Sequence, residues 1–288
     1  FGTDASVVTD AEVSYVWTNT NAGIGLAEGP VSGSTGIGAF TATNETYAPI
    51  YGDIVVTPTY TYDGKACAGT PDTFRITVNP TAVVNQPANV VVCHGTDTSV
   101  TFTTPNEGGA VRYTWTNSNE AQFSLTADAT GNVAGFTATN TTDTSISTTI
   151  TVTPHFSSQE VECTGEAKTF TVTVNPQVRM DKPANDTICH GAEMAAVNFA
   201  TAITDGSVTY AWTRDNANVT GVDNSGTGNI AAATLSNLTT TAQTVTFTVR
   251  PTYHNNGLDC EGADSTFVVV VNPQVRMDKP ANDTICHG

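Results

Sequence analysis

The chain has 288 residues, of which 27 are acidic and 10 are basic, giving a net charge of −17 at pH 7. Ten cations cannot form a basic surface of useful extent, so we expect neither nucleic acid nor an anionic membrane surface as a partner. Charged residues make up only 13% of the chain, so polar uncharged residues must cover most of the surface, as in secreted proteins. No apolar run approaches the roughly 20 residues that span a bilayer, and we expect no membrane insertion in this segment.

The sequence repeats itself with a period of 96 to 98 residues. Tyr15-Val-Trp17-Thr returns at Tyr113 and Tyr210, and Cys-His-Gly stands at 93–95, 189–191 and 286–288. A period of this length is a whole domain rather than a solenoid turn. We therefore predict three domains, residues 1–93, 94–189 and 190–288. Val174–Gly191 recurs letter for letter at Val271–Gly288, which suggests growth by copying and a piece of a longer protein.

Alternation of Thr with Val and other apolar residues at period two dominates each repeat, and it predicts half-buried strands. We find no convincing amphipathic helix. Several short strands per repeat, separated by Gly, Asn and Pro, predict an all-β fold of tandem antiparallel Ig-like sandwiches in an extended array. In the middle repeat the predicted strands are Ser99–Thr104, Arg112–Ser118, Gln122–Ala127, Ala134–Asn140, Ile146–His155 and Thr169–Val174, followed by an extended stretch at Val178–Ile188.

Trp17, Trp115 and Trp212 occupy the same place in each repeat. They correspond to the core tryptophan of an Ig-like third strand, and the Tyr two residues earlier should share the same face. A proline late in the fifth predicted strand also recurs, at Pro58, Pro154 and Pro251. Because proline cannot donate to a ladder, this position should be a strand end, an edge or a bulge.

Five segments of the middle repeat carry a family resemblance: Trp115–Asn119, Gly131–Asn140, Thr149–Pro154, Cys163–Pro176 and the Cys-His-Gly at 189–191. Together they resemble the PKD-like repeats of very large surface proteins of Bacteroidota, including gliding-motility adhesins exported by the type IX secretion system. The resemblance covers the whole chain and implies an extracellular location at the cell surface.

Two cysteines per repeat, in a chain of secreted character, predict disulfides. Cys67 and Cys93, Cys163 and Cys189, and Cys260 and Cys286 are each 26 residues apart, with the Asn-Pro dipeptide midway between them. If the chain folds back antiparallel about each Asn-Pro, these three pairs close and use all six residues. The main alternative is a bond from the first-strand cysteine of one domain to the hairpin cysteine of the next.

Apart from the disulfides, the sequence gives little indication of metal-binding, catalytic or cofactor-binding residues. One His beside one Cys in each repeat lacks the four-ligand clustering of a structural zinc site, so we predict no metal there and an exposed His. The recurring residues are Trp, Pro, Gly and Cys, which are architectural, and we predict no catalytic residues and no enzyme activity. We predict no cofactor, with calcium at interdomain loops as the alternative for the acidic residues Asp53, Asp63, Asp72, Asp143, Asp259 and Asp264.

Two kinds of glycosylation signal occur. Asp186-Thr187-Ile and Asp283-Thr284-Ile resemble the O-glycosylation pattern of Bacteroidota, which makes Thr187 and Thr284 candidate acceptors. Asn-x-Ser/Thr sequences begin at Asn44, Asn140, Asn185, Asn218, Asn237 and Asn282.

These features predict a stalk segment of a large extracellular repeat adhesin, which holds a binding tip away from the cell and has neighbouring repeats as its partners. The alternative is a carbohydrate- or protein-binding Ig-like module, with surface glycans or a host or substratum surface as the ligand. Its candidate contact residues are the aromatic side chains of Tyr47, Tyr51, Tyr60, Tyr62 and Phe156.

Overall fold

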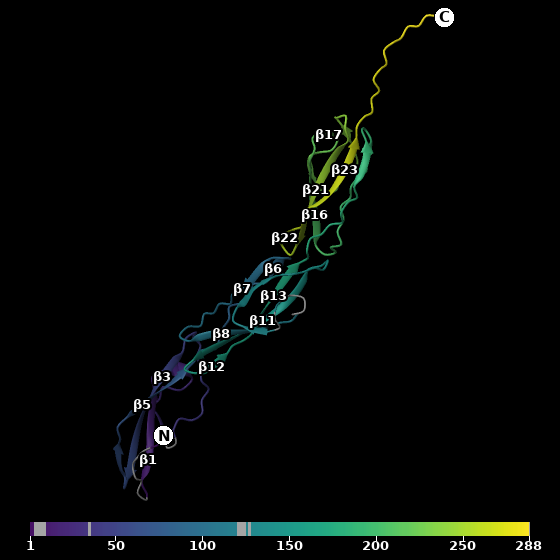
Figure 1. Cartoon of the computed structure of the whole chain (residues 1–288). Coiled ribbons are helices and arrows are strands. Elements are labelled where there is room, and N and C mark those ends of the chain that lie inside the picture. Colours follow the sequence, from purple (N-terminus) through teal and green to yellow (C-terminus); the bar gives the residue numbers. More distant parts are fainter. Residues whose placement is uncertain (3–9, 34–35, 120–124, 126–127, 288) are drawn as a thin grey trace.

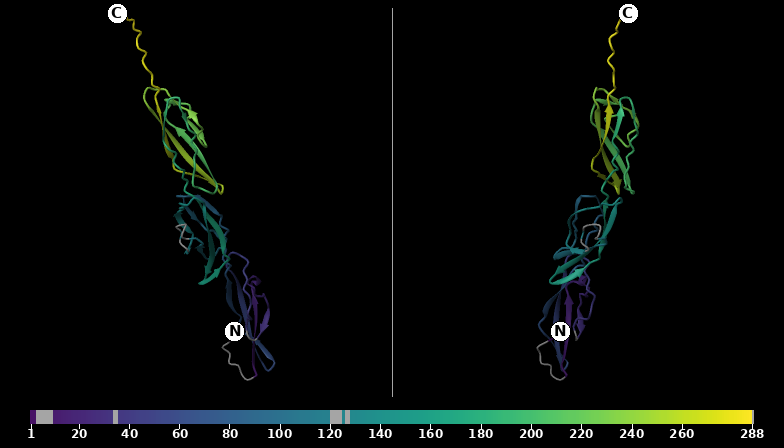
Figure 2. Two further views of the ribbon diagram at one scale, coloured as in Figure 1. Left: turned by 90° about the vertical axis from the view of Figure 1, so that its right-hand side faces the viewer. Right: turned by 45° about the vertical axis from the view of Figure 1, so that its right-hand side comes forward.

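Three β-sandwich units follow one another along a rod, and the chain beyond the last strand leaves the third unit as an extended tail (Figures 1 and 2). The computed structural model describes residues 1–2, 10–33, 36–119, 125 and 128–287. The predicted fold class, an extended array of Ig-like sandwiches, is confirmed. Among the described residues no helix is long or apolar enough to cross a bilayer.

The second unit has the most complete sandwich. Its large sheet has the order β6-β13-β11-β8-β9, with β12 also paired to β11, and β10 pairs with β7 in the facing layer. The strands are β6 (Val90–Cys93), β7 (Asp97–Val100), β8 (Ala110–Asn117), β9 (Asp128–Thr130), β10 (Val133–Thr137), β11 (Ile146–Ser158), β12 (Val161–Thr164) and β13 (Lys168–Asn175).

The third unit repeats this plan, with the sheet order β14-β23-β21-β16-β18 and β22 paired to β21. Its strands are β14 (Asp186–Cys189), β15 (Glu193–Met194), β16 (Ser207–Arg214), β17 (Val219–Thr220), β18 (Ser225–Thr227), β19 (Ala233–Thr234), β20 (Ser236–Asn237), β21 (Gln243–Asn255), β22 (Leu258–Glu261) and β23 (Ser265–Asn272). β14 adds to β23 in parallel, as β6 adds to β13.

The first unit has a sheet of order β2-β1-β3-β4, and β5 pairs with β3 on the same edge as β4, opposite β1. Its elements are β1 (Glu12–Asn19), the 3₁₀ turn η1 (Ala22–Ile24), β2 (Val31–Gly33), β3 (Ile50–Tyr62), β4 (Lys65–Ala68) and β5 (Asp72–Val78). Within the described residues, β5 has β3 as its one strand partner.

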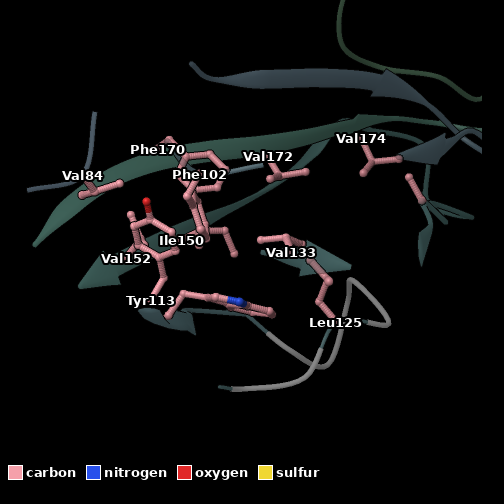
Figure 3. Close-up of a cluster of buried hydrophobic side chains, with 12 residues drawn as sticks. Val84, Phe102, Tyr113, Leu125, Val133, Ile150, Val152, Phe170, Val172 and Val174 are labelled. Carbon is pink, nitrogen blue, oxygen red and sulfur yellow. The ribbon is translucent and has the colours of Figure 1, made fainter. Parts of the chain in front are cut away.

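In the second and third units the core lies between the two layers of the sandwich, and in the first unit it lies against the described sheet. Trp17, Trp115 and Trp212 are 5%, 3% and 7% exposed, and the tyrosines two residues before them share their faces. In the second unit, Tyr113, Ile150, Val152 and Phe170 pack against residues of the facing layer such as Val133 (Figure 3). Large aromatic side chains supply much of the apolar area that a sandwich of this size can bury.

The sheets divide the chain differently from the predicted boundaries at 93 and 189. Val90–Cys93 pairs with β13 of the second unit, and Asp186–Cys189 pairs with β23 of the third. The first strand of the second and third units therefore ends at the cysteine instead of beginning after it. Sequence period alone sets the length of a repeat but not the point at which each unit starts.

Most predicted strands of the middle repeat overlap observed ones, namely β8, β10, β11 and β13. Ser99–Thr104 overlaps only the end of β7, and only the last residues of Val178–Ile188 form a strand, β14. Gln122–Ala127 lies largely outside the described residues. The hairpin strands β4, β12 and β22 were not anticipated, because at four residues each they are too short to show alternation.

The recurring proline marks a change of strand partner. β11 pairs with β13 up to Val152 and with β12 from His155 onward, so Pro154 lies at the gap between the two. Gly165 N donates to Pro154 O at 3.0 Å, and Gly69 to Pro58 and Gly262 to Pro251 repeat this contact at 2.8 Å. The backbone N–H and C=O of one residue point to the same side of a strand. The position at which proline has no N–H therefore faces the gap between β12 and β13, and no hydrogen bond between strands is lost there.

Candidate functional site

The strongest candidates for functional sites are the joints between consecutive units. The Cys93–Cys260 disulfide joins the second unit to the third, with the two Cα atoms 5.6 Å apart. Cys93 ends β6 of the second unit, and Cys260 lies in β22, in the terminal hairpin of the third. This is the arrangement that the sequence offered as the alternative, a first-strand cysteine bonded to the hairpin cysteine of the next unit.

The predicted pairs Cys67–Cys93 and Cys260–Cys286 are therefore wrong, and Cys163 and Cys189, the third predicted pair, carry free thiols. That prediction required the chain to fold back after each Asn-Pro. Instead the chain continues forward into the next unit, and β6 lies parallel to β13 with Cys93 opposite Asn175. Cys93 is thus held at the exit end of the second unit, where the third unit begins.

The end of the last strand of the second unit and the residues after it pack into the joint. Asn175 is fully buried, and its Nδ2 lies 3.6 Å from Cys260 Sγ. Val178 is 6% exposed and clusters with Tyr253 and Cys260. A Cβ built on Gly262 would lie 2.8 Å from Val178 O, so the hairpin approaches the linker as closely as a glycine allows. The Val-Asn-Pro motif is therefore part of the interface as well as a link.

A polar network closes the other side of the same joint. Ser145 N donates to Asp205 Oδ2 at 2.9 Å, and Ser145 Oγ lies 3.0 Å from the Tyr253 hydroxyl. Asn255 Nδ2 donates to Ser145 Oγ at 3.1 Å. Burial raises the pKa of the Tyr253 phenol, so its hydroxyl stays protonated at neutral pH. Hydrogen bonds between groups on both units fix the rotation of one against the other.

The joint between the first and second units has the same plan without a disulfide. Asn79, the counterpart of Asn175, donates through Nδ2 to Ser158 O at 3.0 Å and to Val161 O at 3.2 Å, both in the hairpin of the second unit. Phe156, in the same hairpin, is fully buried. A Cβ on Gly165 would lie 1.7 Å from Ala82 O, so this contact also requires glycine.

His94 and His190 are half-buried and have backbone partners, which differs from the predicted exposed side chains, whereas His287 is exposed. Asn140 N donates to His94 Nδ1 at 2.9 Å, and Asn237 N lies 3.1 Å from His190 Nδ1. A ring nitrogen that accepts a backbone hydrogen bond is not free to ligate a metal. Among the described residues no group of three or more His, Cys, Asp or Glu side chains could hold a metal ion.

His155 and His254 have partners that the sequence did not reveal. His155 lies 3.0 Å from Thr114 Oγ1 and 3.3 Å from Glu162, and His254 lies 2.7 Å from both Thr209 Oγ1 and Asp259. Each trio has the order of a hydroxyl, an imidazole and a carboxylate. The members lie side by side on three adjacent strands of one sheet face, so we assign them a structural role as cross-strand polar pairs.

Two of the acidic residues considered for calcium binding, Asp53 and Asp264, form ion pairs with arginine side chains. Asp53 forms an ion pair with Arg75 at 2.8 Å, and Asp264 forms one with Arg250 at 2.7 Å. The hydrogen bonds from these guanidinium groups lower the pKa of both carboxyls. Both pairs lie on exposed sheet faces within single units.

Two of the glycosylation candidates at Asn are structural residues. Asn140 and Asn237 are 2% and 3% exposed, and each donates through Nδ2 to two backbone carbonyls, one of them on the last strand of its unit. The hydroxyl of the Thr two residues later bonds to the Asn side chain. These hydrogen bonds connect the Asn-x-Thr segment to the last strand of the same unit. The O-glycosylation candidates Thr187 and Thr284 are both exposed.

The candidate ligand-binding aromatics do not form one surface. Tyr47, Tyr51 and Tyr62 are exposed, Tyr60 is half-buried, and Phe156 is buried in the hairpin of the second unit. The guanidinium of Arg75 lies 3.7 Å from the centre of the Tyr51 ring and covers one face of it. The exposed members all belong to the first unit.

A protein-family model matches one of the three units. The family model of the PKD-like domain matches residues 186–275, which are the third unit from β14 to just past β23. This supports the PKD-like resemblance for that unit. No curated protein sequence matches the chain.

Among solved structures, the chain is similar to three N-terminal domains of the outer capsid protein Hoc of bacteriophage RB49, with 15% identity, a TM-score of 0.38, and coverage of 92% of this chain and 89% of that one. It is also similar to the FN1–FN3 domains of chicken CNTN1, with 10% identity, a TM-score of 0.32, and coverage of 91% and 90%. The ectodomain of human desmocollin-1 gives 12% identity and a TM-score of 0.32; the match covers 91% of this chain and spans 54% of that ectodomain.

Proposed function

We propose that this chain is a spacer that resists bending, a stalk segment of an extracellular repeat adhesin that presents a binding tip away from the cell surface. The observation that carries the proposal is the joint between the second and third units. A disulfide, a buried asparagine, an apolar cluster and a polar network all connect the two units there. A chain that only linked independent binding modules would not require such fixed joints.

The extracellular location rests on the disulfide, because such bonds persist in oxidising surroundings. The finer assignment is to the cell-surface adhesins of Bacteroidota whose repeats the sequence resembles, with gliding motility and type IX secretion as the setting. We assign no enzyme activity to this segment. The sandwich units and the acidic surface are compatible with this role.

Small-angle X-ray scattering on the whole chain tests the proposal. Three units joined end to end should give a maximum dimension of roughly 100–120 Å or more, as strand rise and domain size imply. A Gly165→Ala variant should broaden the distance distribution, because its Cβ cannot fit against Ala82 O. Gly69→Ala is the matched control, since the same addition meets only Pro58 of its own unit.

A compact particle, or an identical scattering curve for both variants, would contradict the stalk. The alternative role, a carbohydrate- or protein-binding module, is tested separately by glycan arrays. We expect no binding to the second or third unit, because the exposed tyrosines are confined to the first.

A further inference from the structure

The segment that enters the second unit from the first, Pro80–Cys93, runs along the whole length of the second unit. At its start, Ala82 O lies against Gly165, in the turn that leads into β13. Its later partners on β13 are, in order, Thr169 for Gln86, Thr171 for Asn89 and Asn175 for Cys93. The segment and its neighbour advance along the unit almost residue for residue. Pro80–Cys93 is therefore extended, with little slack between the two joints.

The last strand of the third unit continues the same path. Cys260 lies in β22 at the joint, and β23 (Ser265–Asn272) follows after a short crossing. β23 runs parallel to β14 and ends opposite Cys189, so it leads away from the joint. It passes directly into the tail at the far end of the unit (Figure 1). A strand is already close to the full length of its chain, with a rise of about 3.3 Å per residue against a maximum of about 3.6 Å.

The Cys93–Cys260 disulfide connects these two extended segments. Its Cα atoms are 5.6 Å apart, although the two residues are 167 positions apart in the sequence. Two covalent routes therefore join the end of β6 to the hairpin of the third unit. One passes through the two sulfur atoms. The other passes through residues 94–259, which contain the rest of the second unit and the third unit as far as β22.

We propose that Pro80–Cys93, the disulfide and Cys260–Asn272 form a covalent strap that carries tension along the second and third units. When a chain is pulled, tension passes through the shorter of two parallel covalent routes, and here that route runs through the sulfur atoms. The loop of residues 94–259 would have to unravel completely before it took any load. Most of the second and third units therefore lies outside the path of the force.

Strand pairing holds the strap in place. β6 pairs with β13, and β23 lies between β14 and β21. The hydrogen bonds of these ladders run across the strands, so a pull along the strap loads them together instead of one after another. Because the strap is already extended, pulling on it releases no long stretch of chain. The length of these two units under tension is then set by covalent bonds.

The first unit provides a reference within the same chain. Cys163 occupies the place of Cys260 in the joint between the first and second units, and it carries a free thiol. Cys67, the hairpin cysteine of the first unit, is also a free thiol. Tension in the first unit therefore runs through its own strands, and this unit should unravel when the chain is pulled.

The strap adds a mechanical role to the stalk proposed above and depends on a different feature of the joint. Stiffness of the rod depends on packing and hydrogen bonds, such as those of Val178 and Ser145. The strap depends on the covalent route through Cys93 and Cys260. A measurement under load therefore tests the strap separately from the shape of the unloaded rod.

Single-molecule stretching of the whole chain, held by peptide tags at its two ends in non-reducing buffer, tests the proposal. The wild type should release one long stretch of chain, from the first unit, and then stop lengthening. Cys93→Ser/Cys260→Ser should release three such stretches, one from each unit. Its final length should exceed that of the wild type by about 550–600 Å, because 167 more residues bear load at about 3.3–3.6 Å each.

Two further variants separate the strap from general effects of substitution. Cys189→Ser removes a free thiol from the same Cys-His-Gly sequence and should stretch like the wild type. Ile150→Val trims a fully buried core residue of the second unit, inside the loop. It should lower the force of one release in the Cys93→Ser/Cys260→Ser background. In the bonded protein it should leave the force of every release unchanged.

Equal final lengths for the wild type and Cys93→Ser/Cys260→Ser would overturn the proposal, since tension would then pass through the long loop. A change in release force caused by Ile150→Val in the bonded protein would also overturn it, because the second unit would then be under load. A chain that fails the scattering test but stops lengthening after one release would refute the stiff rod and retain the strap. The two proposals therefore fail separately.

Discussion

Val174–Gly191 and Val271–Gly288 have the same sequence and different structures. In the first copy Val178 is 6% exposed and Asp186–Cys189 forms β14 on the edge of β23. In the second copy Val275 is 93% exposed, and the same residues form no strand. Strand formation here depends on the neighbouring edge rather than on the residues themselves, as expected when β-propensity reflects packing and burial.

The cysteines show the same dependence. Cys189 and Cys286 stand in identical sequences that are equivalent to the one around Cys93, yet only Cys93 is bonded. Cys93 has the hairpin of a following unit within reach, and the other two do not. A bond between units therefore requires that the first-strand cysteine of one unit meet the hairpin cysteine of the next.

The largest expected effect comes from substituting the same valine in the two copies. Val178→Asp should lower the free energy of unfolding by about 3–5 kcal/mol, because it removes a buried apolar side chain and buries a charge. Val275→Asp should leave the stability of the monomer unchanged. Denaturant unfolding followed by tryptophan fluorescence at low protein concentration measures the change in stability for both variants. Equal changes would show that Val178 does not pack against the third unit in solution.

Removal of the disulfide should have the next largest effect. Cys93→Ser should destabilise the joined second and third units by about 2–4 kcal/mol, whereas Cys286→Ser should have no effect on the monomer. Calorimetry in oxidising and reducing buffer measures the loss. Under reducing conditions the wild type and Cys93→Ser should coincide; if they still differed, the side chain rather than the bond would be responsible.

A smaller effect is expected for the asparagine that fixes strand register. Asn185→Ala removes the acceptor for Val268 N and should cost about 1 kcal/mol, while Asn282→Ala should change nothing in the monomer. Hydrogen exchange at the Val268 amide should become faster in the first variant only. Unchanged protection at that amide would show that the side chain does not hold β14 in register.

The smallest effect on stability is expected from the exposed ion pairs. They lie within single units, so removing them should not change how the two copies of the identical segment differ. The hydrogen bond from Arg112 lowers the pKa of Glu162. A lowered pKa in the folded state stabilises the protein above the ordinary carboxyl range, and this contribution is lost as the pH falls through the folded-state value. Arg112→Ala should raise the pKa of Glu162 in an NMR titration, and an unmoved pKa would contradict the pairing.

Much of the fold could be predicted from the sequence. The period gave the number of units, and the alternation of Thr and Val gave strands such as β11 and β13. The recurring Trp marked core positions, because a large aromatic residue at a fixed place in each repeat has few other roles. The hairpin strand β12 and the unit boundaries could not be predicted, since four residues show no periodicity and a repeat has no intrinsic starting point.

The joint was harder to predict. The spacing of 26 residues favoured Cys67–Cys93, but spacing does not show whether a chain turns back or continues after Asn-Pro. The roles of Asn79 and Asn175 in contacting the next hairpin left no local signal apart from their recurrence. The Asn-x-Thr sequences at Asn140 and Asn237 resembled glycosylation sites, because the same atoms serve either role and burial alone distinguishes them.

The residues by themselves determined that this protein is a row of β-sandwiches with aromatic cores, because side-chain alternation and burial act over a few neighbouring positions. Only the tertiary structure decided which cysteines meet and which copy of an identical segment becomes a strand. Those outcomes depend on groups far apart in the chain, such as Cys93 and Cys260, that are brought together only when whole units stack.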